Sequence, residues 1–486
     1  MTPGLAAGEG FTPELLVELA ERAGQPDFPR LEKQLRSTGY CARPVRLKGH
    51  TEVCGEDGRW RSTWSTATEP DGVLRKACGN RREAICPACA ERYRQDAYHL
   101  IAAGLRGGKG VPDSVSAHPM IFATLTAPSF GPVHTRVLGA DGRPKRCRPR
   151  RDAPVCPHGE SLSCTAVHDE GDECLGAALC RECFEYDRAL LWNSLLGELW
   201  RRTTIYLPRK LAQRLGITQK RLKQLVRAAY VKVAEYQQRG LVHVHVVIRL
   251  DEALPTYRRD VIRAPDHRFT VELLEHALRA AAAAVTVPVP AEAGGGFVRW
   301  GAQLDVQHIG ANEAGRCAGY LAKYATKATE QAGGVLHRVS EHEVDELAVS
   351  PHVREYLRHA FALDVQVADR KLARNAHAFG YRGHCLTKSR RYSTTFKQLR
   401  ADREAFVHAQ ILARSRDAAQ LAIAAAAPDR RRGVYAFDGQ GHFTTLQGLL
   451  AEKGRARERE MRRIAREELC DQPPTRREHP CQTPQR

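Results

Sequence analysis

The sequence predicts a protein of mixed helices and strands, with cysteine-rich segments between them. Residues 230–250 read YVKVAEYQQRGLVHVHVVIRL, two extended stretches that meet at Arg239-Gly240 and indicate a β-hairpin. Apolar residues recur with helical spacing from 184 to about 203, and the stretch 312–330 also has a helical pattern. Closely spaced cysteines interrupt the front half of the chain and indicate metal-stabilised modules.

The composition favours a protein that meets nucleic acid. The chain has 486 residues, enough for about two to four domains, and a hydrophobic fraction of 42% that permits buried cores. Its net charge of +19 is typical of proteins that contact phosphate backbones, although a basic protein without a nucleic-acid role is the alternative. Because neither a signal peptide nor a membrane-length apolar run is visible, we expect a cytoplasmic protein. In that reducing compartment, 15 cysteines favour metal ligation over disulfides.

The N-terminal part is expected to be a leader over residues 1–50, followed by a cysteine-rich module over 51–118. Cys86-Pro-Ala-Cys89 has the tight spacing that places two thiolates on one tetrahedral zinc. We therefore predict a zinc-ribbon-like module, with Cys41 as a reserve ligand. The four predicted ligands are Cys54, Cys78, Cys86 and Cys89.

A core is expected over residues 119–330, beginning with an apolar strand, MIFATLT, at 120–126. A second cysteine cluster interrupts this core at about 140–184. The segment is rich in Gly, Pro and Asp, so a bound metal would supply the folding energy that a small apolar core cannot. Six cysteines and two histidines lie there, and their spacing leaves open which four bind. The zinc candidates are Cys156, Cys164, Cys180 and Cys183.

The stretch 211–228, LAQRLGITQKRLKQLVRA, allows two interpretations. A helix, a turn at Gly216 and a second basic helix that begins at an N-cap Thr218 match a helix-turn-helix, whose second helix can enter a major groove. An ordinary helical hairpin that covers a sheet has the same pattern.

The hairpin at 230–250 carries a candidate metal site. His243 and His245 are two residues apart on one strand, so their side chains share a face. Glu235 precedes His243 by eight residues, on the neighbouring strand, where the hairpin can bring it alongside. Two histidines and a carboxylate suit Mg²⁺ or Mn²⁺ when open positions remain for substrate oxygens. Alone, such a pair is equally consistent with a half-buried strand surface.

The predicted helix 312–330 carries a candidate nucleophile. Tyr320, Lys323, Tyr324 and Lys327 have the spacing that places them on one helix face. A phenol has a pKa near 10, and neighbouring ammonium groups and a metal favour the phenolate that a tyrosine nucleophile requires. The alternative is two tyrosines packed against extended lysine side chains.

The last third of the chain is expected to be basic throughout. Residues 331–400 form a predicted DNA-binding extension, in which 379–395 interleave cations with aromatic rings, a composition that suits phosphates and stacked single-stranded bases. Residues 401–486 are expected to be a helical, partly disordered basic tail. The predicted DNA-contacting residues are Arg382, Lys388, Arg390 and Arg391.

The order of these motifs resembles that of the HUH endonucleases, in which two histidines flank a bulky apolar residue, here Val244. The histidines precede the tyrosines, as in the replication initiators of that superfamily, and Tyr320-x3-Tyr324 is similar to the pair in two-tyrosine initiators. RGLVHVH, YLAKYATK and FGYRGHCLTKSRRYST resemble the RepSA-type initiators of actinobacterial plasmids and integrative conjugative elements. The resemblance covers about residues 50–400, and the long cysteine-rich insertion departs from many HUH proteins.

This resemblance implies an α+β fold, in which an antiparallel sheet of the ferredoxin or RNA-recognition type has flanking helices and added zinc modules. It implies that Glu235, His243 and His245 hold Mg²⁺ or Mn²⁺ at the scissile phosphate, while Zn²⁺ is structural. Tyr324 would attack first and Tyr320 at termination, which gives a 5′-phosphotyrosine link and a free 3′-OH.

The resemblance also implies a rolling-circle initiator that nicks and rejoins single-stranded origin DNA. Lys323 and Lys327 would stabilise the phosphate charge. The 3′-OH would prime a DNA polymerase, and a host helicase would unwind the duplex, because the sequence contains no Walker motif for an ATP-driven motor.

Two other functions fit the same motifs. A rolling-circle transposase combines a zinc module, the HUH motif and paired tyrosines in the same order, and neighbouring genes would separate it from an initiator. A zinc-dependent DNA-binding regulator without catalysis would tolerate phenylalanine in place of both Tyr320 and Tyr324.

Overall fold

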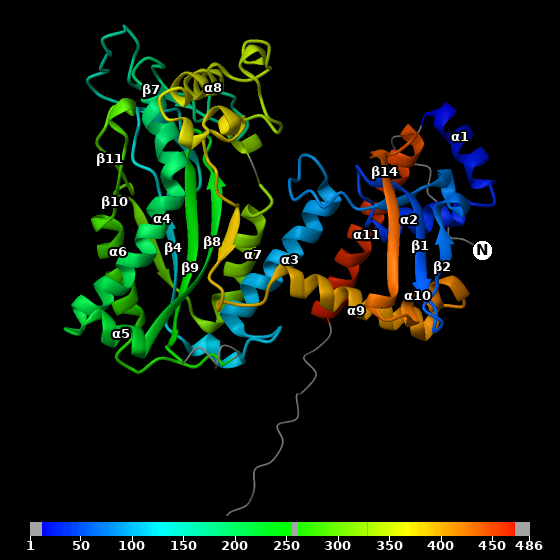
Figure 1. Ribbon diagram of the computed structural model, residues 1–486. Helices are drawn as coiled ribbons and strands as arrows, with labels where there is room; N and C mark the ends of the chain where they lie inside the picture. The colour runs from blue at the N-terminus through cyan, green and yellow to red at the C-terminus, as the bar shows by residue number, and fades with distance from the viewer. Residues whose placement is uncertain (1–11, 255–260, 328, 472–486) are drawn as a thin grey trace, which may run out of the picture. The chain divides into compact units, whose positions relative to one another are not determined.

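The computed structural model describes residues 12–254, 261–327 and 329–471 (Figure 1). The start of the predicted leader, at 1–11, and the end of the predicted tail, at 472–486, lie outside the described residues. None of the helices in the described part of the chain is long and apolar enough to cross a membrane.

The chain forms two compact units whose boundaries differ from those predicted. The first joins the residues up to Arg92 with those from Asp402 onwards, and the second is Tyr93–Ala401. The predicted module 51–118 is therefore divided between the units. The predicted tail, 401–486, belongs to the first unit because its strand pairs with a strand from the N-terminal part.

A five-stranded antiparallel sheet forms the centre of the second unit, in the order β12-β4-β9-β8-β13. The predicted hairpin is confirmed: β8 and β9 pair along their whole length around a turn at Gly240, whose positive φ of 79° suits glycine. Antiparallel sheets and helices together confirm the α+β class. The strands are β4 (Met120–Leu125), β8 (Val226–Tyr236), β9 (Val242–Glu252), β12 (Leu304–His308) and β13 (Leu386–Lys388).

Side chains of β8 and β9 alternate between two cores, as the period of two in a strand requires. On one face, Val231, Val233 and Val247 pack with α3 (Pro87–Arg106) and α7 (Ala314–Tyr324). On the other face, the sheet packs against three further helices (Figure 1). These are α4 (Tyr186–Arg214), α6 (Val271–Ala284) and α8 (Pro351–Asp364).

The stretch 211–228 contains the end of α4, a turn, a short second helix and the start of β8, which is compatible with both interpretations of the sequence. Its second helix, α5 (Gln219–Leu225), has seven residues and leads directly into β8. Thr218 caps this helix as predicted, by accepting a hydrogen bond from a backbone N–H of the first turn. Leu222 is buried in the core that α4 joins, whereas the polar side chains of α5 are exposed.

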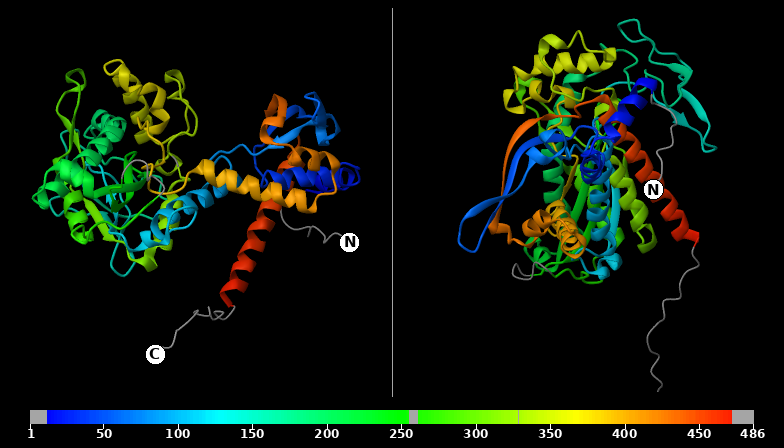
Figure 2. Two further views of the ribbon diagram at one scale, coloured as in Figure 1. Left: turned by 60° about the horizontal axis from the view of Figure 1, so that its bottom comes forward. Right: turned by 90° about the vertical axis from the view of Figure 1, so that its right-hand side faces the viewer.

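The remaining strands of the second unit are short. The predicted strand at 297–309 is two strands, β12 and β11 (Phe297–Arg299), and the latter pairs with β10 (Thr286–Pro288). The cysteine-rich insertion forms a three-stranded sheet that projects from the rest of this unit (Figure 2). Its strands are β5 (Val137–Leu138), β6 (Pro144–Arg148) and β7 (Cys164–Val167).

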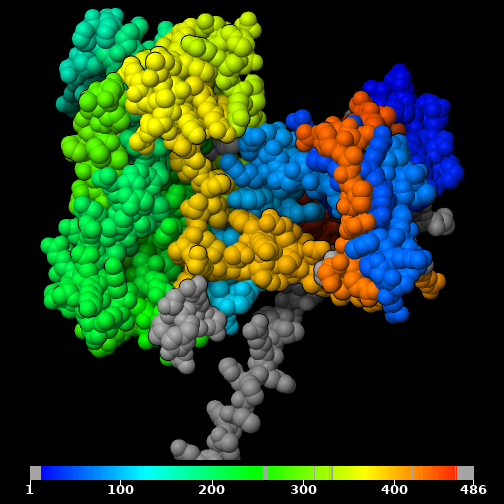
Figure 3. Space-filling view, in the orientation of Figure 1, coloured from blue at the N-terminus to red at the C-terminus, as the bar shows by residue number. Residues whose placement is uncertain are grey.

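The first unit is built on β1 (Val45–Cys54), which pairs with three strands. One is β14 (Arg431–Gln440), which lies beside β1 in the space-filling view (Figure 3). The others are β2 (Trp60–Ser65) and β3 (Leu74–Lys76). The tail, predicted to be helical and partly disordered, contains helices but also β14, which pairs with β1 almost 400 positions earlier, a pairing that local spacing cannot reveal.

Helices of the first unit bury a small apolar cluster. Leu31 and Leu35 from α2 pack with Leu446 and Leu450 from α11. The helix α9 (Phe396–Arg414) spans the boundary between the units. The other helices are α1 (Pro13–Ala23), α2 (Phe28–Ser37), α10 (Ala418–Ala425) and α11 (Thr445–Asp471).

Candidate active site and metal centres

The ladder between β8 and β9 places the predicted metal ligands on one face of the sheet. Glu235 lies directly opposite His243, and Val233 lies opposite His245. Since alternate residues share a face, all three predicted ligands project toward the side that α7 covers, together with Val247.

Hydrogen bonds fix the ring of His245 from both sides. Its Nε2 lies 2.7 Å from Oε2 of Glu235, and its Nδ1 lies 3.1 Å from Oγ1 of Thr124 on the adjacent strand β4. Such second contacts orient a ligand ring and set its tautomer. Thr124 has no recognisable signal in the sequence, because only the pairing of β4 with β9 places it opposite His245.

His243 is available as a neutral ligand. Burial, with His245 and Arg239 nearby, lowers the pKa of His243 to about 3, so the imidazole is neutral at physiological pH. Its Nε2 is buried and has no hydrogen-bond partner among the described residues. A neutral imidazole with a free ring nitrogen is the form that binds a metal.

The donor set therefore fits a divalent cation, although the three groups do not yet converge. The ring centroids of His243 and His245 are 6.0 Å apart, and the donor atoms of these rings and Glu235 do not all lie within 4.8 Å of one another. To bind one ion together, these side chains would have to rotate, and the contact between Nε2 of His245 and Glu235 would have to be replaced.

Both predicted nucleophiles lie against the ring of His245. Tyr324 stacks on it with ring centroids 5.3 Å apart and an interplanar angle of 30°, and Tyr320 meets it edge-on at 5.5 Å. The two phenol rings are 4.7 Å apart. Phe122 of β4 contacts both His245 and Tyr320, and thus forms the side wall of this aromatic cluster.

The two tyrosines differ in their electrostatic surroundings. The ammonium Nζ of Lys327 is 4.8 Å from the ring centroid of Tyr324, and that of Lys323 is 6.0 Å away. Lys327 lies beyond the end of α7 at Tyr324, so the prediction of four residues on one helix face holds only for the first three. Its ammonium nevertheless reaches Tyr324 from the following turn.

Tyr320 is 44% exposed, yet its phenol is hard to ionise. Burial of its hydroxyl end and a hydrogen bond with Tyr324 raise its pKa above the ordinary value, and the charge of Glu235 acts in the same direction. Tyr324, by contrast, has two ammonium groups around its ring, those of Lys323 and Lys327.

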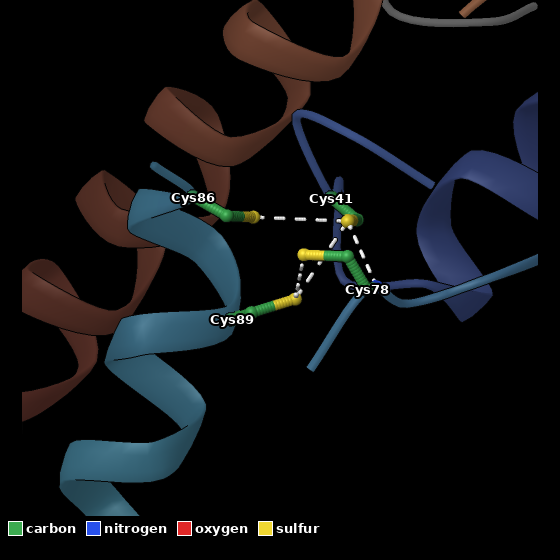
Figure 4. Close-up of side chains that lie close together, drawn as sticks. All are labelled: Cys41, Cys78, Cys86 and Cys89. Carbon is green, nitrogen blue, oxygen red and sulfur yellow. Dashed lines mark hydrogen bonds between the residues drawn. The ribbon is translucent and has the colours of Figure 1, made fainter. Parts of the chain in front are cut away.

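Four thiols converge in the first unit, from the residues Cys41, Cys78, Cys86 and Cys89 (Figure 4). Cys41 Sγ is 3.7 Å from the Sγ atoms of both Cys86 and Cys89, and Cys78 Sγ is 3.6 Å from that of Cys89. Tetrahedral zinc with Zn–S bonds of about 2.3 Å separates its sulfurs by about 3.8 Å, so this geometry fits Zn²⁺. Cys54, a predicted ligand, does not join this group, because it lies on β1 with its thiol directed to the carbonyl of Gly55, and the reserve ligand Cys41 takes its place.

Besides a set of three residues, His168, Asp172 and Cys174, the insertion holds two further groups of four. One consists of Cys156, His158, Cys180 and Cys183, and it includes three of the four predicted ligands. The other consists of His134, Cys147, Cys164 and His168. Cys164 therefore does not join the other predicted ligands. His134 lies before the predicted start of the insertion, so spacing within the cluster could not reveal it.

The four predicted DNA-contacting residues differ in how far their side chains are exposed to solvent. Arg382 and Arg390 are exposed, and Arg391 is half-buried. Lys388 lies on β13, where its Nζ donates to the carbonyl of Ser393 at 2.8 Å and burial lowers its pKa. The Lys388 ammonium thus holds a loop of the protein, so it is less available to DNA than Arg382 and Arg390.

Comparisons with known proteins agree with this description. A model of the RepSA family, described as "Replication initiator protein, pSAM2", matches residues 27–456. A replication initiator protein from Streptomyces ambofaciens is 40% identical over 478 residues, which cover 95% of this chain and 97% of that protein. No solved structure matches the chain. The chain therefore belongs to the RepSA family of replication initiators, and the predicted family is confirmed.

Proposed function

We propose that the chain is a rolling-circle replication initiator that acts as an HUH-type nicking and joining endonuclease on single-stranded origin DNA. The replicon would be a plasmid or an integrative conjugative element. The observation that carries this proposal is the contact of two tyrosine rings with His245, which Glu235 and Thr124 hold in place. A regulator without catalysis would not require two phenols beside a histidine with a fixed ring. Membership of an initiator family favours an initiator over a transposase.

In the first step, Tyr324 acts as the nucleophile. Its Oη forms a bond to the scissile phosphorus, and the bond from phosphorus to the 3′ oxygen breaks. The phenolic proton is released to solvent, and the 3′ oxygen takes up a proton to become the 3′-OH that primes a DNA polymerase. Lys327 and Lys323 favour this step because their charges stabilise both the phenolate and the phosphate oxygens.

Glu235, His243 and His245 would hold Mg²⁺ or Mn²⁺ beside these tyrosines. When bound, the ion would supply Lewis-acid polarisation of the non-bridging phosphate oxygens. His243 contributes a neutral nitrogen and Glu235 a carboxylate, a mixture of ligands that suits such ions.

Tyr320 would take part in the second transfer, at termination. There its Oη attacks the phosphorus at a newly copied origin, and a 3′-OH is released. This 3′-OH then attacks the phosphorus linked to Tyr324, which rejoins the strand and frees the Tyr324 phenol. The energy of the phosphodiester bond stays in the protein–DNA link, so no ATP is consumed. The sequence contains no Walker motif, and a host helicase would separate the strands.

The three groups of four would bind three structural Zn²⁺ ions. The insertion has short strands and few buried apolar side chains, so metal binding would supply much of its folding energy.

The proposal can be tested with a pool of single-stranded oligonucleotides that covers the origin of the chain's own replicon. Wild-type protein with Mn²⁺ should form a covalent protein–DNA adduct, and EDTA should abolish it. His243→Ala and His245→Ala should each lower adduct formation by at least about 100-fold, as loss of a metal ligand or its support commonly does. His276→Ala is the matched control, since His276 is exposed on α6 and bonds only a backbone carbonyl. An adduct that forms equally well in EDTA would contradict the metal site.

A further inference from the structure

A cavity of about 530 Å³ lies at the end of the central sheet, beside the candidate active site. The C-terminal ends of β4 and β8 and the N-terminal ends of β9 and β12 lie at this edge of the sheet. The cavity is lined from the sheet side by Thr126, Gln237, Gln238, Arg239 and Gln303. None of these residues belongs to the proposed metal site or to the tyrosine pair.

Two residues that line the cavity follow residues of the site by two positions along their strands. Thr126 follows Thr124, the partner of His245, by two residues, and Gln237 follows Glu235 by two residues. A strand rises about 3.3 Å per residue, so each step is about 7 Å, close to the spacing of successive phosphates in a single strand. A strand of DNA with its phosphate at the metal site would therefore bring a neighbouring nucleotide to this cavity.

The sheet side of the cavity is rigid. The guanidinium of Arg239 donates to the backbone carbonyls of Pro128 and Ala127, at 3.2 and 3.3 Å. Thr126 Oγ1 donates to the carbonyl of Gln303 at 2.9 Å. These bonds hold the three loops in a fixed arrangement before any ligand arrives, which reduces the entropic cost of binding.

The opposite wall comes from the cysteine-rich insertion. Gly176 lies so close to the turn between β8 and β9 that a Cβ there would come within 2.3 Å of the backbone of Gln238. His134 and Arg148 also line the cavity. His134 belongs to one of the insertion's metal groups, and Arg148 follows Cys147 of the same group.

The chemistry of the lining suits a nucleotide. Its members include Arg148 and Arg239 but no carboxylate. The Nε of Arg148 is buried and lacks a hydrogen-bond partner in the part of the chain that the structure describes. Gln238 and Gln303 are exposed, so their amides can face a ligand. By contrast, a larger cavity of about 960 Å³ near α8 contains five acidic side chains, which would repel a phosphate.

We propose that the smaller cavity binds one unpaired nucleotide of the substrate strand next to the scissile phosphate, and that Gln238 and Gln303 read the edge of its base. This inference rests on the proposed nicking function. The volume of about 530 Å³ falls within the range of small-ligand pockets. An amide that offers both a donor and an acceptor can pair with one base edge and discriminate against the others by about tenfold or more.

The test uses a pool of single-stranded oligonucleotides randomised around the nick site, with Mn²⁺, and sequencing of the strands that become linked to the protein. Wild type should prefer one base at a position next to the nick. Gln238→Ala and Gln303→Ala should each reduce that preference by about tenfold at this position alone. Gln303→Glu should change which base is preferred, since a carboxylate only accepts hydrogen bonds. Gln307→Ala, on β12 outside the cavity, should keep the wild-type profile.

Two results would overturn the inference while leaving the nicking function intact. The first is an unchanged base preference in both alanine variants and in Gln303→Glu. The second is a loss of adduct that is uniform over all sequences, which would indicate a structural effect rather than base reading. Absence of any wild-type adduct would instead refute the proposed nicking function, and this inference with it.

Discussion

At the scale of single residues, the candidate site depends on the precise placement of His245. Its two ring nitrogens contact Glu235 and Thr124. Tyr324 stacks on the ring, and Tyr320 meets it edge-on. A small displacement of this ring would therefore change the metal geometry and the tyrosine positions together. His243, which has an unpartnered nitrogen among the described residues, has no comparable anchor.

Replacement of Thr124 by valine tests this arrangement without a change in volume. We expect Thr124→Val to weaken Mn²⁺ binding or nicking by about 10- to 100-fold, since the ring of His245 loses the contact that orients it. Titration of nicking against Mn²⁺ concentration measures the effect. Thr204→Val is the control, because the Thr204 hydroxyl bonds only within α4. Equal Mn²⁺ dependence in wild type and Thr124→Val would rule out this role.

Lys232 is a buried charge whose removal should stabilise the protein. It lies on β8 with 7% exposure, and burial lowers its pKa to about 8, whereas an unfolded lysine titrates near 10.4. Below pH 8 the folded state must hold the charged form, which costs about 3 kcal/mol. The unfolded state binds more protons between these two pKa values, so this cost disappears as pH rises from about 8 to 10.5.

We therefore expect Lys232→Met to raise the free energy of unfolding at pH 7, and the gain to shrink toward pH 10. Denaturant unfolding of both proteins across this range measures it. Lys220→Met, at an exposed position on α5, should show no such gain. A Lys232→Met protein that is less stable at pH 7 would indicate that the ammonium has a favourable interaction.

At the scale of elements, local spacing predicted the β8–β9 hairpin but not its neighbours. The period of two and the turn at Gly240 fix the register that places Glu235 opposite His243. The pairing of β4 with β9, which brings in Thr124, joins segments about 120 residues apart and leaves no local pattern. The same reason explains why β14 was predicted to be helical.

Local spacing also left one ligand of the four-cysteine group in the first unit unassigned. Cys86 and Cys89 were recognisable as a knuckle, but the choice between Cys41 and Cys54 depends on where β1 begins. Cys41 precedes the strand and is free to turn inward, whereas Cys54 ends it. Sequence could therefore indicate a metal module without assigning all of its ligands.

A glycine in β1 should be essential for the sheet of the first unit. Gly49 has φ +151°, and a Cβ there would lie 2.0 Å from the carbonyl oxygen of Val434 on β14. We expect Gly49→Ala to destabilise this unit by at least about 2 kcal/mol, because two strands must separate to admit the methyl group. Amide hydrogen exchange should show lost protection in β1 and β14.

The control for this change is Gly197→Ala, since Gly197 lies in α4 with no atom near its missing Cβ. There alanine should stabilise the helix by about 1 kcal/mol. Protection of β1 and β14 that is the same in Gly49→Ala and wild type would contradict the close approach of these strands.

At the scale of the whole molecule, basic character and metal groups are distributed over both units. The net charge of +19 favours long-range attraction to DNA, as a replication initiator requires, and it predicts strong salt dependence of binding. The three groups of four lie in different parts of the chain, one in the first unit and two in the second. Each would stabilise a segment with little apolar core.

The purified protein should contain three zinc ions per chain. Native mass spectrometry should show loss of one ion in Cys180→Ser, because this group would keep only three of its ligands. Cys54→Ser should retain all three, since Cys54 lies outside the groups. A zinc content that falls equally in both variants would contradict the assignment of Cys41 in place of Cys54.

In the proposed function, a tyrosine of α7 becomes covalently joined to DNA. The most direct measurement is a denaturing gel of wild type, Tyr320→Phe, Tyr324→Phe and the double variant after incubation with single-stranded origin DNA and Mn²⁺. We expect a denaturation-resistant adduct with wild type and Tyr320→Phe, at least a 100-fold loss with Tyr324→Phe, and none with the double variant. Cleavage by the double variant, or cleavage by wild type without a protein–DNA link, would contradict the tyrosine mechanism.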